Sequence, residues 1–78
     1  MRIDKFLKMT HIIKRRTIAN EVAGAGRIKV NGKIVKPSYM VKIGDKVEIQ
    51  FGDKVSQFEI LQIPTRQGQP LEEMVKIL

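Results

Sequence analysis

Gly26-Arg27-Ile28-Lys29-Val30-Asn31-Gly32 is the stretch that decides the fold of this 78-residue chain. Within it, apolar residues alternate with basic ones, which is the two-residue period of a half-buried strand. Asn31-Gly32 then precedes a second apolar pair, Ile34-Val35, and a type I′ turn needs positive φ at both of its central residues. The stretch therefore predicts a β-hairpin, which Lys36-Pro37-Ser38 ends because proline has no N–H to donate to a sheet.

Two helices are predicted before this hairpin. From Arg2 to Thr10, the apolar positions 3, 6, 7 and 10 follow the i, i+3, i+4, i+7 spacing of a helix, and the basic residues lie on a different side. A second helix is predicted from Thr17, as its N-cap, to Ala25, and Gly26 takes the C′ position that follows it.

Turns at Gly44-Asp45 and Gly52-Asp53 separate two further predicted strands, over residues 46–51 and 55–63, and Pro64 ends the second. We expect an imperfect register in that strand, because Val55 and Phe58 are an odd number of positions apart. Residues 65–70 are predicted to be a polar linker, and residues 71–78 either a short helix or a strand docked on the sheet. The predicted fold class is α+β, with two short N-terminal helices packed on a small, mostly antiparallel sheet.

The charge of the chain is large and unevenly distributed. Lys and Arg number 15 against 8 Asp and Glu, which gives a net charge of +7. Residues 1–36 hold ten basic and two acidic groups, whereas residues 37–78 hold five basic and six acidic groups. This segregation indicates that a polyanionic partner binds the first half of the chain.

The composition also excludes several classes of protein. Cysteine is absent, which removes disulfides, thiolate nucleophiles and Cys-ligated zinc, and His11 is the only histidine. No nucleophile stands in a pattern with a base, so we expect no enzyme, no metal and no cofactor. No stretch is apolar enough for a secretory signal or a membrane span, so a soluble, cytoplasmic protein is expected, with no membrane partner and as a monomer.

Lys14, Arg15 and Arg16 stand immediately before the second predicted helix, where the positive end of the helix dipole opposes them. A phosphate between these side chains and the free helix N–H groups would relieve the conflict. Asp4 is either an acid favoured at a helix start, which is the preferred interpretation, or a carboxylate that orients basic side chains. The predicted RNA-binding set is Arg2, Asp4, Lys5, Lys8, Lys14, Arg15, Arg16, Arg27 and Lys29, with Lys33 as an extension.

Structured RNA is favoured over single strands because the chain is poor in aromatic residues that could stack on bases. Its three Phe fit core positions, and Tyr39 is the one candidate for stacking. A half-buried position beside the Pro37 turn is the favoured interpretation of Tyr39.

Five stretches occur together in a specific order: Arg2-Ile3-Asp4-Lys5-Phe6-Leu7, Lys14-Arg15-Arg16-Thr17, Gly26 to Gly32, Lys36-Pro37-Ser38 and Gly44-Asp45. In these stretches the chain resembles the RNA-binding domain first described in ribosomal small-subunit protein four, also called the αL motif. The resemblance spans roughly residues 1–51. It implies an αL-type RNA-binding domain over residues 1–63, a short linker and tail over residues 64–78, and RNA contacts made first by Arg2 and Arg16.

Among stand-alone members of that family, the chain is most similar to bacterial ribosome-quality-control factors. This resemblance implies a ribosome-associated protein that contacts large-subunit rRNA and peptidyl-tRNA on obstructed large subunits. It also implies support for an RqcH-type partner that adds alanine residues to the stalled chain. Large-subunit recycling or assembly, a generic structured-RNA-binding module, a DNA-binding helix-turn-helix regulator and a protein-interaction module that uses the sheet edge remain as alternatives.

Overall fold

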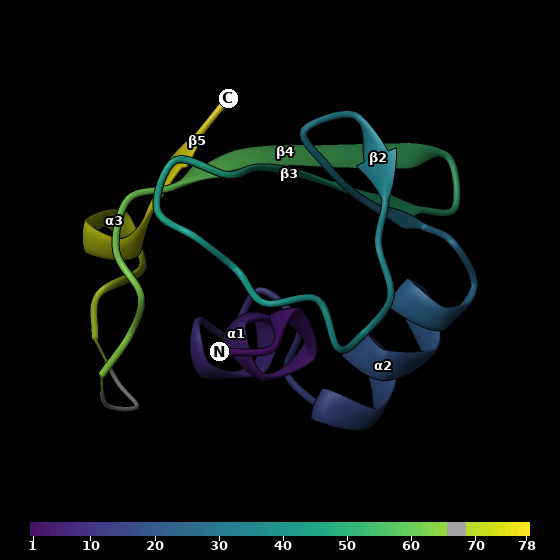
Figure 1. Cartoon of the computed structure of the whole chain (residues 1–78), viewed down its shortest axis with the longest axis horizontal. Helices are drawn as coiled ribbons and strands as arrows, with labels where there is room; N and C mark the ends of the chain where they lie inside the picture. The colour runs from purple at the N-terminus through teal and green to yellow at the C-terminus, as the bar shows by residue number, and fades with distance from the viewer. Residues whose placement is uncertain (66–68) are drawn as a thin grey trace.

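The computed structural model describes residues 1–65 and 69–78, and its architecture is α+β, as predicted. Helices α1 (Ile3–Met9) and α2 (Arg16–Gly24) lie on one face of a five-stranded antiparallel sheet (Figure 1). The strands are β1 (Ile28–Val30), β2 (Lys33–Ile34), β3 (Lys46–Phe51), β4 (Lys54–Ile60) and β5 (Val75–Ile77), in the spatial order β2-β1-β3-β4-β5. A third, four-residue helix, α3 (Leu71–Met74), precedes β5. No helix of the described residues is long and apolar enough to cross a membrane.

The predicted hairpin is confirmed. Strand β1 pairs with β2 in the register Val30↔Lys33, which leaves Asn31 and Gly32 as a two-residue turn. Both turn residues have positive φ, +52° for Asn31 and +84° for Gly32, as a type I′ turn requires. Asparagine and glycine tolerate this left-handed conformation best, so these two residues determine the position of the turn.

The expectation of an imperfect register in β4 is wrong. Strands β3 and β4 pair without interruption from Lys46↔Glu59 to Phe51↔Lys54. Phe58 and Ile60 face the core, whereas Val55 belongs to the opposite face and is 53% exposed, so its apolar side chain carries no information about register. The strand ends at Ile60 and not at Ile63, and beyond it the N–H groups of Leu61 and Gln62 both donate to Met74 O (2.7 and 3.2 Å), at the end of α3.

Helix α2 ends as predicted but begins differently. Its N-cap is Arg15, so Thr17 lies inside the first turn and the predicted N-cap at Thr17 is wrong. At the other end, Gly26 has φ +76° and donates its N–H to Ala23 O (3.0 Å), while Arg27 N–H donates to Val22 O (3.2 Å). This pair of bonds is a Schellman motif, which satisfies the last carbonyls of the helix and directs the chain into β1.

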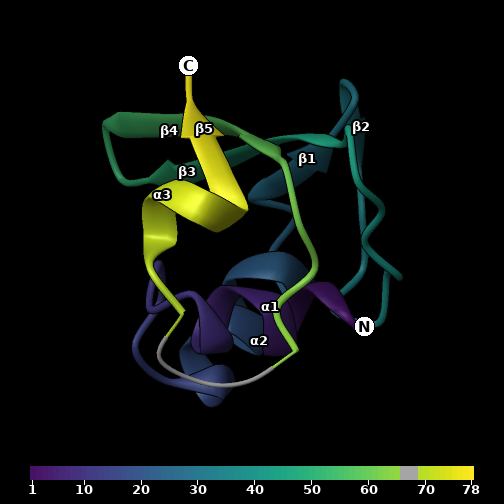
Figure 2. The ribbon, with the colours of Figure 1, turned by 90° about the vertical axis from the view of Figure 1, so that its left-hand side faces the viewer.

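Figure 2 shows from the side that α1 and α2 lie on one side of the sheet. The buried side chains that form the core come from these helices and from the face of the sheet toward them. Phe6 of α1 stacks on Phe58 of β4 with ring centroids 6.4 Å apart, and both side chains are at most 2% exposed. On α2 the buried residues are Ala19 and Ala23, whereas Ile18 is 41% exposed. These small side chains allow α2 to approach α1 closely, which determines the spacing of polar groups on the other side of the helix pair.

The C-terminal segment adopts both of the predicted alternatives in succession. Helix α3 is followed directly by β5, which pairs antiparallel with β4 in the register Ile60↔Val75. Met74 and Val75 are 0% and 3% exposed, so the segment contributes side chains to the core. The predicted linker over residues 65–70 includes residues 66–68, which lie outside the described residues.

Candidate nucleic-acid interface

Arg2 is positioned by the backbone on both of its sides. It is the N-cap of α1 with extended dihedral angles (φ −66°, ψ 148°), and it forms a bridge with Met40 in the loop between β2 and β3. Ile3 N–H donates to Tyr39 O (2.7 Å), and Val41 N–H donates to Met1 O (2.9 Å). These bonds anchor the start of α1 to the loop, so the backbone position from which the Arg2 side chain extends is fixed.

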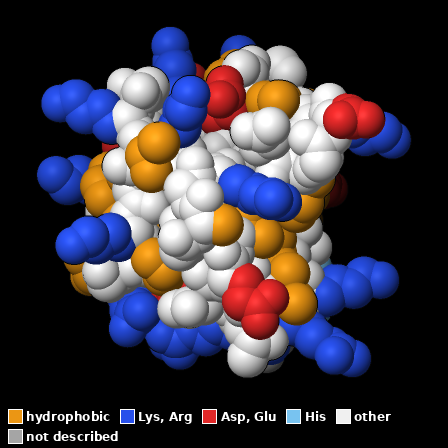
Figure 3. Space-filling view, turned by 90° about the vertical axis from the view of Figure 1, so that its right-hand side faces the viewer, with side chains coloured by type: hydrophobic (Ala, Val, Ile, Leu, Met, Phe, Trp, Pro, Cys, Tyr) orange, Lys and Arg blue, Asp and Glu red, His pale blue; other side chains and the backbone are white. Residues whose placement is uncertain are grey.

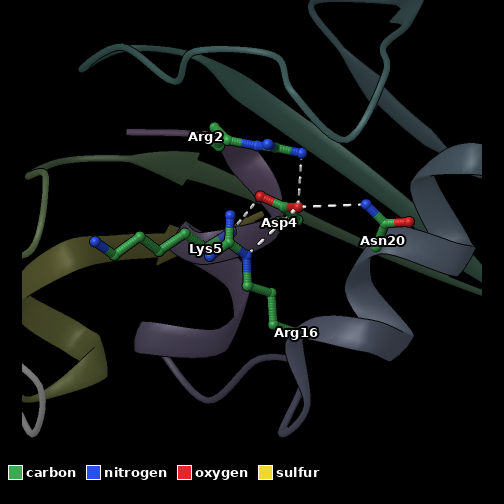
Figure 4. A network of polar contacts seen from close by, with 5 residues as sticks. All are labelled: Arg2, Asp4, Lys5, Arg16 and Asn20. Atoms are coloured by element: carbon green, nitrogen blue, oxygen red, sulfur yellow. Dashed lines mark hydrogen bonds and ion pairs between the residues drawn. The ribbon is translucent and has the colours of Figure 1, made fainter.

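Asp4 lies in the first turn of α1, and its carboxylate is the centre of a polar cluster (Figure 4). The residue is 1% exposed. Its Oδ1 accepts the Lys5 backbone N–H (2.8 Å), and its Oδ2 accepts Nη2 of Arg2 (3.2 Å) and Nδ2 of Asn20 (3.5 Å). Nε of Arg16 forms an ion pair with the same Oδ2 at 3.6 Å. One buried carboxylate therefore holds side chains from both helices.

The two arginines remain available to a ligand. Their side chains are 44% exposed for Arg2 and 49% for Arg16, whereas the Asp4 side chain is 2% exposed. Guanidinium groups have five N–H donors, and one or two contacts with Asp4 leave the others free to bind a phosphate. Both interpretations of Asp4 therefore fit the structure. Asp4 is an acid in the first turn of α1, where its Oδ1 accepts the Lys5 N–H, and its Oδ2 contacts the two exposed cations.

The start of α2 adds a second feature that suits an anion. No described side chain caps this helix, its first turn contains no acidic residue, and Arg15 and Arg16 occupy the N-cap and first helical positions. The free N–H groups at a helix N-terminus attract anions. A shallow hollow here is lined by Arg2, Asp4, Arg16, Thr17 and Asn20, so backbone donors and guanidinium groups share one depression.

Sequence reasoning missed Asn20 and Thr17 as members of this site. Asn20 is exposed and follows Arg16 by four residues, which places the two on the same face of α2. This spacing was visible in the sequence, but the partner of Asn20 was not. Asp4 is sixteen residues away along the chain, and only the packing of α1 on α2 brings its carboxylate to Asn20.

The remaining predicted contact residues are distributed over a wider surface. Lys5 is exposed beside Asp4, Lys8 is partly buried in the last turn of α1, and Lys14 and Arg15 are exposed before α2. Lys and Arg side chains project around the rim of the molecule when it is viewed from the α2 side (Figure 3). These residues extend the arginine pair on the helical side of the protein.

Arg27 and Lys29 are exposed but do not join the Asp4 cluster. Lys29 is the outward-facing residue of β1, between buried Ile28 and Val30, so it lies on the face of the sheet that the helices do not cover. The structure therefore separates Lys29 from Arg2 and Arg16, although all three stand in basic motifs of the sequence.

Tyr39 and His11 are accounted for by the fold. Tyr39 is half-buried, and its hydroxyl donates to Asp45 Oδ2 at 2.8 Å. Burial raises the pKa of Tyr39 above its ordinary value of 10.0, and the hydrogen bond and charge of Asp45 raise it further. His11 is exposed at the end of α1 with φ +59°. Within residues 1–65 and 69–78, no group of three or more His, Cys, Asp or Glu residues is arranged to hold a metal ion.

Comparisons with known proteins agree with this geometry. Residues 1–47 match the family model described as S4 domain. The chain is 54% identical over 63 residues to the "RQC P-site tRNA stabilizing factor" of Streptococcus pneumoniae, covering 81% of this chain and 72% of that protein. It is 38% identical over 73 residues to the protein of the same name from Helicobacter pylori strain J99, covering 94% and 87%. The structure of Vibrio cholerae heat shock protein 15 superposes with a TM-score of 0.87 and 25% identity, over all of this chain and 81% of that one.

The matched region contains both helices, the Asn31-Gly32 turn and the whole Arg2–Asp4–Arg16 cluster. The fold, the cluster and the sequence similarity thus lead to the same assignment. The chain belongs to the S4 domain family of RNA-binding proteins, and its relatives within that family include the RQC P-site tRNA stabilizing factors, or RqcP proteins.

Proposed function

We propose that this protein is an RNA-binding ribosome-quality-control factor that binds large ribosomal subunits obstructed by peptidyl-tRNA. The observation that carries the proposal is the pair of half-exposed arginines, Arg2 and Arg16, which the buried Asp4 carboxylate holds beside the open start of α2. Its relatives are named RQC P-site tRNA stabilizing factors, and this name supports tRNA and the ribosome as the proposed partners.

The cluster suits the phosphate backbone of a folded RNA. An arginine can bind a phosphate with two parallel N–H···O bonds, and this geometry requires that the guanidinium plane be oriented in advance. Asp4 provides this orientation for both side chains, which lowers the entropy lost when RNA binds. Lys5, Lys8, Lys14 and Arg15 would add attraction to phosphates around the pair without selecting a base sequence.

In this proposal the protein acts by holding RNA in place. It contacts large-subunit rRNA and the peptidyl-tRNA together and keeps the tRNA in the peptidyl position. An RqcH-type partner on the same subunit then adds alanine residues to the stalled chain. The similarity to RqcP proteins supports this role, and the Arg2–Arg16 pair supplies the RNA contact that it needs.

Co-sedimentation at fixed salt tests the proposal. Large subunits with and without peptidyl-tRNA, small subunits and intact ribosomes are compared for the wild type and for Arg2→Ala/Arg16→Ala. Lys54→Glu is the matched control, because it changes the net charge by the same amount at an exposed position on β4. We expect a preference for tRNA-obstructed large subunits that only the arginine variant loses.

Other outcomes distinguish the alternative functions. Equal binding to every RNA-containing particle would indicate a generic RNA-binding module, and equal affinity for a plain DNA duplex would favour a helix-turn-helix regulator. In cells, deletion of the gene is expected to remove alanine tails from stalled chains. Intact tails together with defective large subunits would instead indicate a recycling or assembly factor.

A further inference from the structure

A second basic surface surrounds the β1–β2 hairpin. Residues 29–46 contain five lysines and one acidic residue, Asp45. Four of the lysines form what we term the hairpin lysine surface: Lys29, Lys33, Lys42 and Lys46. All four are exposed, and none forms an ion pair with another described residue. Glu48 stands opposite Lys29 and Glu59 opposite Lys46 in the sheet register, so these two acids offset part of the charge. Lys33 pairs with Val30 and Lys42 lies in the loop before β3, so their charges have no acidic cross-strand partner.

The backbone beneath these lysines is held by a network of hydrogen bonds. Asp45 is 6% exposed, and its carboxylate accepts the Tyr39 hydroxyl (2.8 Å), Asn31 Nδ2 (3.2 Å) and the Lys42 N–H (3.0 Å). The Lys46 N–H donates to Asn31 Oδ1 (3.1 Å). These bonds connect the type I′ turn, the loop after β2 and the start of β3. The side chains of Lys42 and Lys46 therefore extend from one rigid stretch of backbone.

The one acidic residue of the segment is occupied within this network. Asp45 faces inward and receives three donors, so it is directed away from the lysine side chains. Lys29 and Lys46 line a hollow on the outer face of the sheet, together with the Asn31-Gly32 turn. Glu48 also lines this hollow, and its carboxylate accepts a hydrogen bond from Gln57 Nε2 (2.8 Å).

This surface is distinct from the arginine pair but physically connected to it. Lys29 lies on the face of the sheet that α1 and α2 leave uncovered, whereas Arg2 and Arg16 lie on the helical side. The loop through Tyr39 joins the two sites, because Tyr39 O accepts the Ile3 N–H and the Tyr39 hydroxyl binds Asp45. A ligand on one surface is therefore held in a defined position relative to a ligand on the other.

We propose that the hairpin lysine surface binds an RNA phosphate backbone and is a second RNA contact of this protein. The inference rests on the proposed RNA-binding function. Unpaired lysines on a rigid base repel one another, and a polyanion removes that repulsion while releasing its own counterions. Lysine acts on phosphate as a point charge, without the planar geometry that arginine imposes, so this contact adds affinity and position without base specificity.

The test is the salt dependence of binding to protein-free large-subunit rRNA. The variant Lys42→Ala/Lys46→Ala is compared with Lys54→Glu, which lowers the net charge equally. Lys54 lies far from the hairpin lysine surface. It pairs with Phe51, which is five residues from Lys46 along β3, or about 17 Å at the usual rise per residue of a strand. Loss of two phosphate contacts is expected to reduce the slope of log K against log salt by about 1.4–1.8. When salt is raised from 50 to 200 mM, the fold-loss in RNA affinity should then be smaller for the variant than for the wild type, by a factor of roughly 7 to 12.

The outcomes separate this inference from the proposed function. Lys54→Glu should keep the wild-type slope. Lys54→Glu and Lys42→Ala/Lys46→Ala should also keep the wild-type unfolding temperature within a few degrees, because they change exposed side chains alone. Arg2→Ala/Arg16→Ala removes both ion-pair partners of the buried Asp4 and is compared at a temperature where it is folded. If Arg2→Ala/Arg16→Ala loses RNA binding while the lysine variant keeps the wild-type slope, the hairpin lysine surface is no RNA contact and the proposed function stands. If neither variant differs from the wild type, both ideas fail. Weaker binding to intact subunits alone, with protein-free rRNA bound normally, would assign the surface to a ribosomal protein and overturn the inference.

Discussion

The substitution Asp4→Asn tests whether this carboxylate positions the two arginines. Asparagine keeps the shape of the side chain but loses the charge and replaces one acceptor oxygen with an NH₂ donor. Removing one partner of a fully buried ion pair costs about 3–5 kcal/mol. Arg2 and Arg16 are each about half exposed and regain water, so a smaller loss of about 1–2 kcal/mol in the free energy of unfolding is expected. For a chain of this size, that loss lowers Tm by roughly 4–16 °C.

The effect of Asp4→Asn on RNA affinity has a diagnostic sign. Removing an acidic group raises the net charge from +7, and electrostatics alone then predicts tighter RNA binding. If Asp4 orients the arginines in the wild type, the variant must immobilise both side chains when RNA binds, and this costs about 0.5–1.5 kcal/mol of binding free energy for each. The sum of about 1–3 kcal/mol corresponds to roughly 5- to 150-fold weaker binding.

Fluorescence anisotropy with a labelled rRNA fragment measures this affinity, at a temperature where the variant is folded. Glu21→Gln is the matched control, because Glu21 is an exposed acid of α2 and its loss changes the net charge equally. We expect Glu21→Gln to bind RNA as well as the wild type or slightly better, and Asp4→Asn to bind more weakly. Binding of Asp4→Asn that equals or exceeds that of Glu21→Gln would refute the positioning role of Asp4.

Three further perturbations test other parts of the structure. Arg16→Ala should reduce the slope of log K against log salt by about 0.7–0.9 in RNA titrations, and an unchanged slope would remove Arg16 from the interface. Because the pKa of Tyr39 is raised in the folded state, stability is fully present below pH 10.0 and is lost as the pH rises through the folded pKa. Urea unfolding from pH 8 to 11 should show this loss in the wild type and a smaller one in Tyr39→Phe, and equal losses would contradict the assignment to Tyr39. Met74→Ala should lower the free energy of unfolding by about 2–5 kcal/mol, since Met74 is fully buried; a change below 0.5 kcal/mol would show that the C-terminal segment is not part of the cooperative core.

The hairpin, the two N-terminal helices and β3 were predictable because their signals are local. Asn31-Gly32 sets a type I′ turn through the backbone preferences of two residues, and Gly26 ends α2 in the same way. The boundaries of β4 and α2 were less well predicted. Val55 is apolar without being buried, and Thr17 is a good N-cap residue that lies in the first turn of α2, since the helix begins at Arg16. Neither side chain reveals in the sequence which neighbours it will meet.

The basic residues of the candidate interface were also visible in the sequence, as a charge conflict at the start of α2 and a basic side on α1. Their grouping was not, because it depends on contacts between segments far apart in the chain. Packing of α1 on α2 brings Asp4 to Arg16 and Asn20, and it makes a buried carboxylate the organiser of the site. Pairing in the sheet places Lys29 on the opposite face.

By itself, the sequence of this protein determined where its backbone turns, which segments are helical or extended, and that one half carries most of the positive charge. These properties follow from dihedral preferences and charges within a few residues. Only the tertiary structure decided that residues 75–77 complete the sheet and that the cations divide into an arginine pair and a lysine surface. Such outcomes depend on burial and distance between remote segments, which no local pattern encodes.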